Sequence, residues 1–168
     1  VTAILKTSEH LSAITNTLKT VMVVIVNWNG KKDLLECLDS LRKIDYPTDC
    51  FRILVVDNGS TDGSPDAVLN HQHVELLKNS ENIGYVKAVN QGVEYCLKQQ
   101  ADYIWVMNND VVVKEDSLKN LVEAGERGEE IGVIAPIIFS YHEPHKIDNV
   151  GYQVNFWTGR LKKLQYGD

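Results

Sequence analysis

The chain has 168 residues, enough for one domain with a substantial hydrophobic core but too few for two typical domains. Hydrophobic residues make up 43% of it and charged residues 24%, as in ordinary globular proteins. The formal net charge of −6 excludes the basic footprint of a nucleic-acid-binding protein, so no nucleic-acid partner is expected.

Residues 1–20 carry only a weak pattern, and we interpret them as a linker or the end of a preceding element. From Val21 onward the pattern sharpens, and residues 21–168 are predicted to form one domain. Apolar runs rich in β-branched residues predict strands, at residues 22–26, 51–56, 74–77, 103–107 and 132–139. Apolar residues at helical spacing predict helices between them, around residues 34–41, after Ser64-Pro65-Asp66, over residues 84–97 and after Asp116.

The helix predicted over residues 84–97 has an apolar stripe made of Val86, Val89, Val93 and Leu97. Residues 147–168, rich in Gly and aromatic residues with alternating apolar positions, are more typical of a β-hairpin. Strands that alternate with helices predict a single α/β domain, with a mostly parallel central sheet and helices on both faces.

Three predicted strands end in clusters of polar residues. These clusters are Asn27-Trp28-Asn29-Gly30, the run from Asp57 to Ser64, and Asn108-Asn109-Asp110. Ligands of open α/β sheets bind beyond the carboxyl ends of the strands, so the three clusters are expected to share one rim. Each cluster alone is also typical of a turn, where Asn, Asp, Gly and Ser serve the backbone.

These clusters, with Glu81-Asn82-Ile83-Gly84-Tyr85 and Asn90-Gln91-Gly92, occur in the order found in one large family. The sequence resembles family 2 of the glycosyltransferases, and especially its rhamnosyltransferase-like bacterial and archaeal members. The similarity runs from about Val21 to Phe139. It implies a single domain of the GT-A fold that binds a nucleotide diphosphate sugar, of UDP or dTDP type, together with Mn²⁺ or Mg²⁺.

The resemblance also assigns roles to residues, all of them in the rim. It implies a nucleotide-sugar site with Trp28 against the base, Asp57 and Asn58 reading the base, Asn109 near the ribose and the helix start at Gly84 near the phosphates, completed by Asn27, Asn29 and Asn108. Core filling is an equal alternative for Trp28. Asn58 stands where the family often has an acidic residue, and an amide can donate as well as accept.

Asp110 is the metal ligand that the resemblance implies, and it is the only carboxylate in its block. One carboxylate is sufficient when substrate phosphates and water complete the coordination of the cation. The pairs His71 and His73, and His142 and His145, lack neighbouring carboxylates or thiols, and we do not interpret them as metal sites.

The family implies an inverting transfer of the sugar to a glycan or lipid-linked acceptor, as in polysaccharide biosynthesis. No convincing catalytic base is found before Asp168, and Glu143 and Asp148 are candidates by charge only. We therefore expect the base to lie beyond Asp168, in a chain truncated at its C-terminus, and this fragment alone to be inactive. A non-catalytic nucleotide-binding module and a sugar nucleotidyltransferase remain the alternatives.

The cellular location is predicted from cysteine usage and hydrophobicity. The three cysteines form no CxxC pair, which favours a reducing cytoplasm. The apolar run at residues 21–26 is too short to cross a bilayer. We expect a cytoplasmic protein, at the inner face of the membrane if regions outside this sequence associate with lipid.

Overall fold

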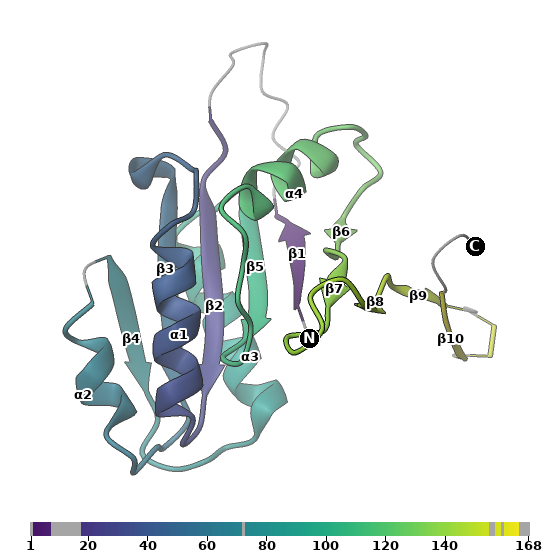
Figure 1. Cartoon of the computed structure of the whole chain (residues 1–168). Coiled ribbons are helices and arrows are strands. Elements are labelled where there is room, and N and C mark those ends of the chain that lie inside the picture. The colour runs from purple at the N-terminus through teal and green to yellow at the C-terminus, as the bar shows by residue number, and fades with distance from the viewer. Residues whose placement is uncertain (1, 8–17, 72, 155–156, 159, 165–168) are drawn as a thin grey trace. The chain divides into compact units, whose positions relative to one another are not determined.

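The computed structural model of the chain describes residues 2–7, 18–71, 73–154, 157–158, 160–164 (Figure 1). The chain divides into two compact units, Val1–Ile134 and Ala135–Asp168. The first unit contains the large sheet and the helices, and the second contains two short strand pairs.

The large sheet has six strands in the order β4-β3-β2-β5-β1-β6. They are β1 (Thr2–Lys6), β2 (Val21–Asn27), β3 (Phe51–Asp57), β4 (Val74–Lys78), β5 (Tyr103–Asn108) and β6 (Val133–Ile134). The four strands β4, β3, β2 and β5 are parallel, whereas β1 is antiparallel to both of its neighbours. The predicted α/β fold with a mostly parallel sheet is confirmed.

Residues 2–6 form strand β1, so this part of the segment interpreted as a linker or the end of a preceding element lies in the sheet. Thr2 pairs with Met107 and Lys6 with Tyr103, so this segment belongs to the same sheet as the rest of the domain. Ile4 is fully buried, and the indole Nε1 of Trp105 donates a hydrogen bond to Thr2 Oγ1 at 2.8 Å. The strand has only five residues, and its pairing depends on a partner about 100 residues away.

Helices cover both faces of the sheet (Figure 1). The helices α1 (Lys31–Leu41), α2 (Ser64–Val68) and α4 (Ser117–Gly125) pack on the face that Val21, Val23 and Ile25 present. On the other face, α3 (Tyr85–Lys98) packs against Met22, Val24 and Val26. Successive side chains of a strand point to opposite faces, so the continuous apolar run of β2 supplies both cores.

The predicted stripe of α3 is confirmed only in part, because Val89 and Val93 pack partly buried against the core whereas its other two residues do not. Val86 and Leu97 are 69% and 50% exposed, and the residues that are buried are the small ones, Ala88, Gly92 and Cys96. Small residues let the helix axis lie close to the sheet, whereas the predicted stripe requires large side chains between the helix and the sheet.

The predicted strand over residues 132–139 is two short strands, β6 and β7 (Ile138–Phe139). Pro136 lies between them and has no N–H to donate to a ladder. In the second unit, β7 pairs with β8 (Ile147–Asn149), and β9 (Tyr152–Val154) pairs antiparallel with β10 (Leu161–Lys163), which confirms the predicted hairpin. A 3₁₀ helix, η1 (Thr48–Cys50), precedes β3. Within the described ranges, no helix has both the length and the apolar character of a membrane span.

Candidate functional site

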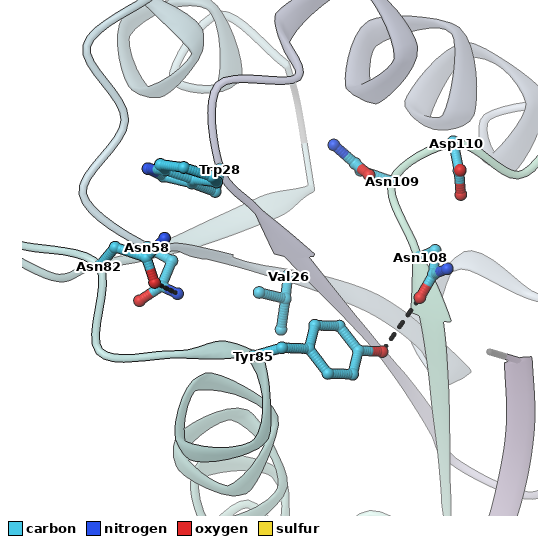
Figure 2. Close-up of a pocket in the computed structure, with 8 residues that line it drawn as sticks. All are labelled: Val26, Trp28, Asn58, Asn82, Tyr85, Asn108, Asn109 and Asp110. Atoms are coloured by element: carbon cyan, nitrogen blue, oxygen red, sulfur yellow. Dashed lines mark hydrogen bonds between the residues drawn. The ribbon is translucent and has the colours of Figure 1, made fainter.

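A pocket of about 270 Å³ opens where the strand order reverses. The chain passes from β2 to β3 on one side, while β5 lies on the other side of β2, so the loops that follow β2 and β5 diverge. Figure 2 shows the residues that line the pocket, namely Val26, Trp28, Asn58, Asn82, Tyr85, Asn108, Asn109 and Asp110. The predicted strand ends therefore converge at one pocket, and five of the nine predicted site residues line this pocket.

Asn27 lies beneath this rim and joins three loops. It is fully buried, and its Nδ2 lies within hydrogen-bond distance of Ser64 Oγ at 2.8 Å, Ser60 Oγ at 3.2 Å and Asp57 Oδ1 at 3.3 Å. Its Oδ1 accepts from Asn109 Nδ2 at 2.8 Å. The side chain thus fixes the loop after β5 to the loop after β3.

Asp57 and Asn29 are also occupied by contacts between loops. The Asp57 carboxylate is fully buried, and its Oδ2 accepts from the backbone N–H of Ser60 at 3.0 Å. Asn29 adopts a left-handed conformation with φ of 51°, and its Oδ1 accepts from the backbone N–H of Thr61 at 2.8 Å. These residues shape the rim from behind and, like Asn27, are not among the lining residues.

One wall of the pocket is a pair of amides. Asn58 is 2% exposed, and its Oδ1 accepts from the backbone N–H of Ile83 at 3.1 Å. Its Nδ2 donates to Asn82 Oδ1 at 2.9 Å. An ionised aspartate at position 58 has no proton for this second bond. The hydrogen bond to Asn82 therefore explains why position 58 is an asparagine, where the family often has an acidic residue.

Gly84 lies behind the same wall. Its φ is 89°, a conformation that favours glycine. Its backbone N–H donates to Asn82 Oδ1 at 2.9 Å, so this particular N–H is not directed at the pocket. The role expected for Gly84 near the phosphates stays a prediction, and this N–H does not contribute to it.

The opposite wall consists of Asn108, which ends β5, and the two residues that follow it, Asn109 and Asp110. The Tyr85 hydroxyl donates to Asn108 Oδ1 at 3.0 Å (Figure 2). Burial of the ring, with a smaller contribution from the Asp110 carboxylate, raises the pKa of Tyr85 above its ordinary value, so the hydroxyl is protonated at neutral pH. Asp110 itself is exposed, and no hydrogen bond or ion pair involves its carboxylate in the described part of the chain.

This donor set fits a divalent cation held jointly with a ligand. The described residues include no cluster of three or more His, Cys, Asp or Glu side chains that could hold a metal alone. Asp110 is the one carboxylate among the lining residues, and its oxygens are accessible. Mg²⁺ is commonly bound by one or two carboxylates with phosphates and water, which is the arrangement this pocket permits.

Sequence reasoning missed three lining residues, Val26, Asn82 and Tyr85. Asn82 and Tyr85 flank Gly84 in a block that was recognised, but only the glycine was assigned to the site. The signal was present in the polar and aromatic character of Glu81-Asn82-Ile83-Gly84-Tyr85. Val26 ends an apolar strand, and nothing in its sequence context separates it from the core.

An open α/β sheet with a polar pocket at its switch point is the architecture of a nucleotide-binding class of domains. Residues 22–166 match glycosyl transferase family 2, and the chain belongs to this family. The predicted family and the GT-A-like fold are thereby confirmed.

Two curated relatives are similar over about half of the chain. The N-acetylglucosaminyl-diphospho-decaprenol L-rhamnosyltransferase of Mycobacterium tuberculosis is 34% identical over 95 residues, which are 51% of this chain and 31% of the relative. Glycosyltransferase AglE of Haloferax volcanii is 33% identical over 84 residues, 48% of this chain and 28% of the relative. The chain thus covers about a third of the length of these relatives.

Among solved structures, the fold is similar to that of the mannosyltransferase PcManGT from Pyrobaculum calidifontis, in complex with GDP-Man and Mn²⁺. The TM-score is 0.56 and the identity 27%, over 64% of this chain and 32% of that protein.

Proposed function

We propose that this chain is the donor-binding part of a glycosyltransferase, which moves a sugar from a nucleotide diphosphate sugar to a glycan or lipid-linked acceptor. The observation that carries the proposal is the exposed Asp110 carboxylate, which shares a pocket with the exposed indole of Trp28 at the switch point of a family 2 fold. We place the reaction in polysaccharide biosynthesis, in the cytoplasm and at the inner face of the membrane.

The donor is proposed to be of UDP or dTDP type. Trp28 is 57% exposed at the pocket, which favours stacking on a base over core filling. Asn58 and Asn82 form the neighbouring wall and present amide groups, while Asp57 and Asn27 hold the loops that carry these groups. Asn109 is proposed near the ribose, and Asn29 and Gly84 maintain the loop conformations around the nucleotide.

The diphosphate is proposed to lie toward Asp110, the carboxylate that would hold Mn²⁺ or Mg²⁺. A bound cation supplies positive charge that stabilises the negative charge growing on the departing diphosphate. PcManGT, which has a similar fold, was solved with a nucleotide sugar and Mn²⁺. The reaction is proposed to invert the anomeric centre, so that the acceptor oxygen bonds to the anomeric carbon as the bond to the diphosphate oxygen breaks.

A base must take the proton of the attacking hydroxyl, and it must lie within hydrogen-bond reach of it. The lining residues include one carboxylate, Asp110, which is assigned to the cation. Glu143 and Asp148 belong to the second unit and remain candidates by charge. We expect the 168-residue chain to bind donor nucleotides and to transfer sugar poorly or not at all.

Calorimetric titration of UDP, dTDP and GDP, each with Mn²⁺ and with EDTA, tests the proposal. We expect saturable binding of UDP or dTDP that Mn²⁺ strengthens, and weaker binding of GDP. Quenching of tryptophan fluorescence by UDP in wild type, and its absence in Trp28→Phe, which retains Trp105 and Trp157, would place the ligand in this pocket. Failure of all three nucleotides to bind would refute the proposed function.

A further inference from the structure

Tyr85 and Asn108 form a hydrogen-bonded pair across the pocket, and the roles assigned so far do not use it. Tyr85 is in the first turn of α3, whereas Asn108 ends β5, so the bond connects two elements that face each other. The Tyr85 ring is 43% exposed and lines the pocket, as does the Asn108 amide. The pair is therefore positioned to meet a ligand.

The orientation of the Asn108 amide follows from this bond. Its Oδ1 accepts from the Tyr85 hydroxyl, and Figure 2 shows the nitrogen directed away from Tyr85. No acceptor for this nitrogen is found among the residues that the structure describes. Because the bond fixes which end of the amide faces Tyr85, the Asn108 nitrogen is available as a hydrogen-bond donor.

We propose that Tyr85 is a positioning residue, which holds Asn108 as a hydrogen-bond donor to an oxygen of the nucleotide diphosphate. The inference rests on the proposed function, since it concerns the same ligand. It gives Asp110 and Asn108 different roles in binding the diphosphate. Asp110 attracts the diphosphate only through a cation, whereas Asn108 attracts it directly, so part of the affinity is independent of metal.

The chemistry of the pair explains why both partners are polar. A phenylalanine at position 85 would keep the ring but leave the Asn108 amide free to rotate by half a turn. An aspartate at position 108 would still accept a hydrogen bond from the Tyr85 hydroxyl, and it could also ligate a cation. It would also repel the diphosphate whenever no cation is bound. UDP binding should therefore depend more strongly on the cation in Asn108→Asp than in Tyr85→Phe.

The test compares wild type with Tyr85→Phe, Asn108→Ala and the double variant, using UDP in EDTA and in Mn²⁺. Tyr85→Phe removes the neutral hydrogen bond that orients the Asn108 amide, and should weaken UDP binding by about two- to tenfold in EDTA. When Asn108 is already alanine, adding Tyr85→Phe should not weaken UDP binding further, because the amide that Tyr85 orients is absent. Uridine, which lacks phosphate, should bind wild type and Tyr85→Phe equally when followed by NMR shifts.

Two further variants complete the design. Asn108→Asp should bind UDP more weakly than wild type in EDTA and should regain the lost affinity in Mn²⁺. Tyr95→Phe removes a hydroxyl from the same helix, where it donates to Glu75 outside the pocket, and should leave UDP binding unchanged.

Additive losses in the double variant, or an equal loss for uridine, would overturn the positioning role, because they mean that Tyr85 acts on the ligand or the fold directly. Unchanged UDP binding by Tyr85→Phe would overturn it as well. In each of these cases wild type binds UDP, so the proposed function survives. If wild type binds no nucleotide diphosphate, both proposals fall together.

Discussion

Asp110 is the residue on which metal dependence is expected to turn. Its carboxylate is exposed and lines the pocket, so Asp110→Ala should leave the fold intact. We expect that Mn²⁺ no longer strengthens UDP binding in this variant. Asn108→Ala should reduce the Mn²⁺-enhanced binding of UDP less than Asp110→Ala does. Calorimetry with and without Mn²⁺ measures the difference.

Glu94→Gln is the matched control for Asp110→Ala, because it removes an exposed carboxylate from the middle of α3, away from the pocket. It should respond to Mn²⁺ like wild type. Retention of a full Mn²⁺ effect by Asp110→Ala would remove Asp110 from the cation site.

Gly30 is constrained by space at the switch point. A Cβ at this position would lie 2.2 Å from Asn109 Nδ2 and 3.2 Å from Asn27 Oδ1, the two atoms that bond across the rim. Gly30→Ala should therefore displace Asn109, with an overpacking cost of about 1–3 kcal/mol in the free energy of unfolding. We also expect weaker UDP binding. Urea unfolding and calorimetry measure the two effects.

The control for Gly30→Ala is Gly132→Ala, since a Cβ at Gly132 meets no atom within 4 Å. It should change neither stability nor binding appreciably. Equal behaviour of the two variants would mean that the rim tolerates movement of Asn109.

At the scale of elements, the approach of α3 to the sheet depends on Gly92. An added Cβ would lie 2.4 Å from Val24 Cγ1 and 3.1 Å from Val56 Cγ2, both in the core beneath the helix. Ala is favoured over Gly in a helix by roughly 1 kcal/mol. We nevertheless expect Gly92→Ala to be destabilising, because overpacking of about 1–3 kcal/mol exceeds or cancels that gain.

Thermal and urea unfolding measure this effect, with Asn90→Ala as the matched control. Asn90 is exposed on the same helix, so its change to Ala should be neutral or slightly stabilising. A stabilised Gly92→Ala variant would show that α3 can move outward at little cost.

A second element-level feature is the polar cluster that holds β1 and α4 together. Glu126 accepts from the Tyr103 hydroxyl and lies 3.4 Å from Lys6 Nζ and 3.5 Å from Lys19 Nζ. Burial alone would raise the pKa of Glu126. The hydrogen bond from Tyr103 and the two lysines outweigh it, and the pKa lies below the ordinary value of 4.5.

The lowered pKa fixes how stability depends on pH. The ionised form is favoured in the folded chain, so the stabilisation is present above about pH 4.5 and is lost as pH falls through the folded pKa. Glu126→Gln should be less stable than wild type at pH 7, and the gap should narrow below pH 4.5. Urea unfolding at several pH values measures the gap, and Glu123→Gln, exposed on α4, should show none. A gap independent of pH would mean that packing, not charge, is the cause.

At the scale of the whole molecule, the sequence predicts the parallel part of the sheet well. The runs at β2, β3 and β5 are apolar on both faces, a pattern that is specific to covered strands. It does not predict β1, since five residues of ordinary composition carry little pattern of their own. It predicts the buried side of α3 only in part, because Val89 and Val93 pack against the core but the fully buried positions are small residues.

The site is predictable to a similar degree. That the strand ends converge follows from topology alone, and Asn27, Asp57 and Asn109 do meet through hydrogen bonds or shared partners. Which side chains turn inward to join loops, and which face the pocket, depends on backbone angles that the sequence does not reveal. Asn27 and Asp57 turn inward, whereas Asn82 and Tyr85 line the pocket.

The antiparallel strand β1 has a consequence for how the chain is made. Thr2 pairs with Met107, so β1 has no partner in β5 until about 100 further residues have been synthesised. At about 5–20 residues per second, that interval lasts on the order of 5–20 s. Throughout it, the apolar side chain of Ile4 stays exposed, and β5 must be synthesised before β1 can be protected from other partners.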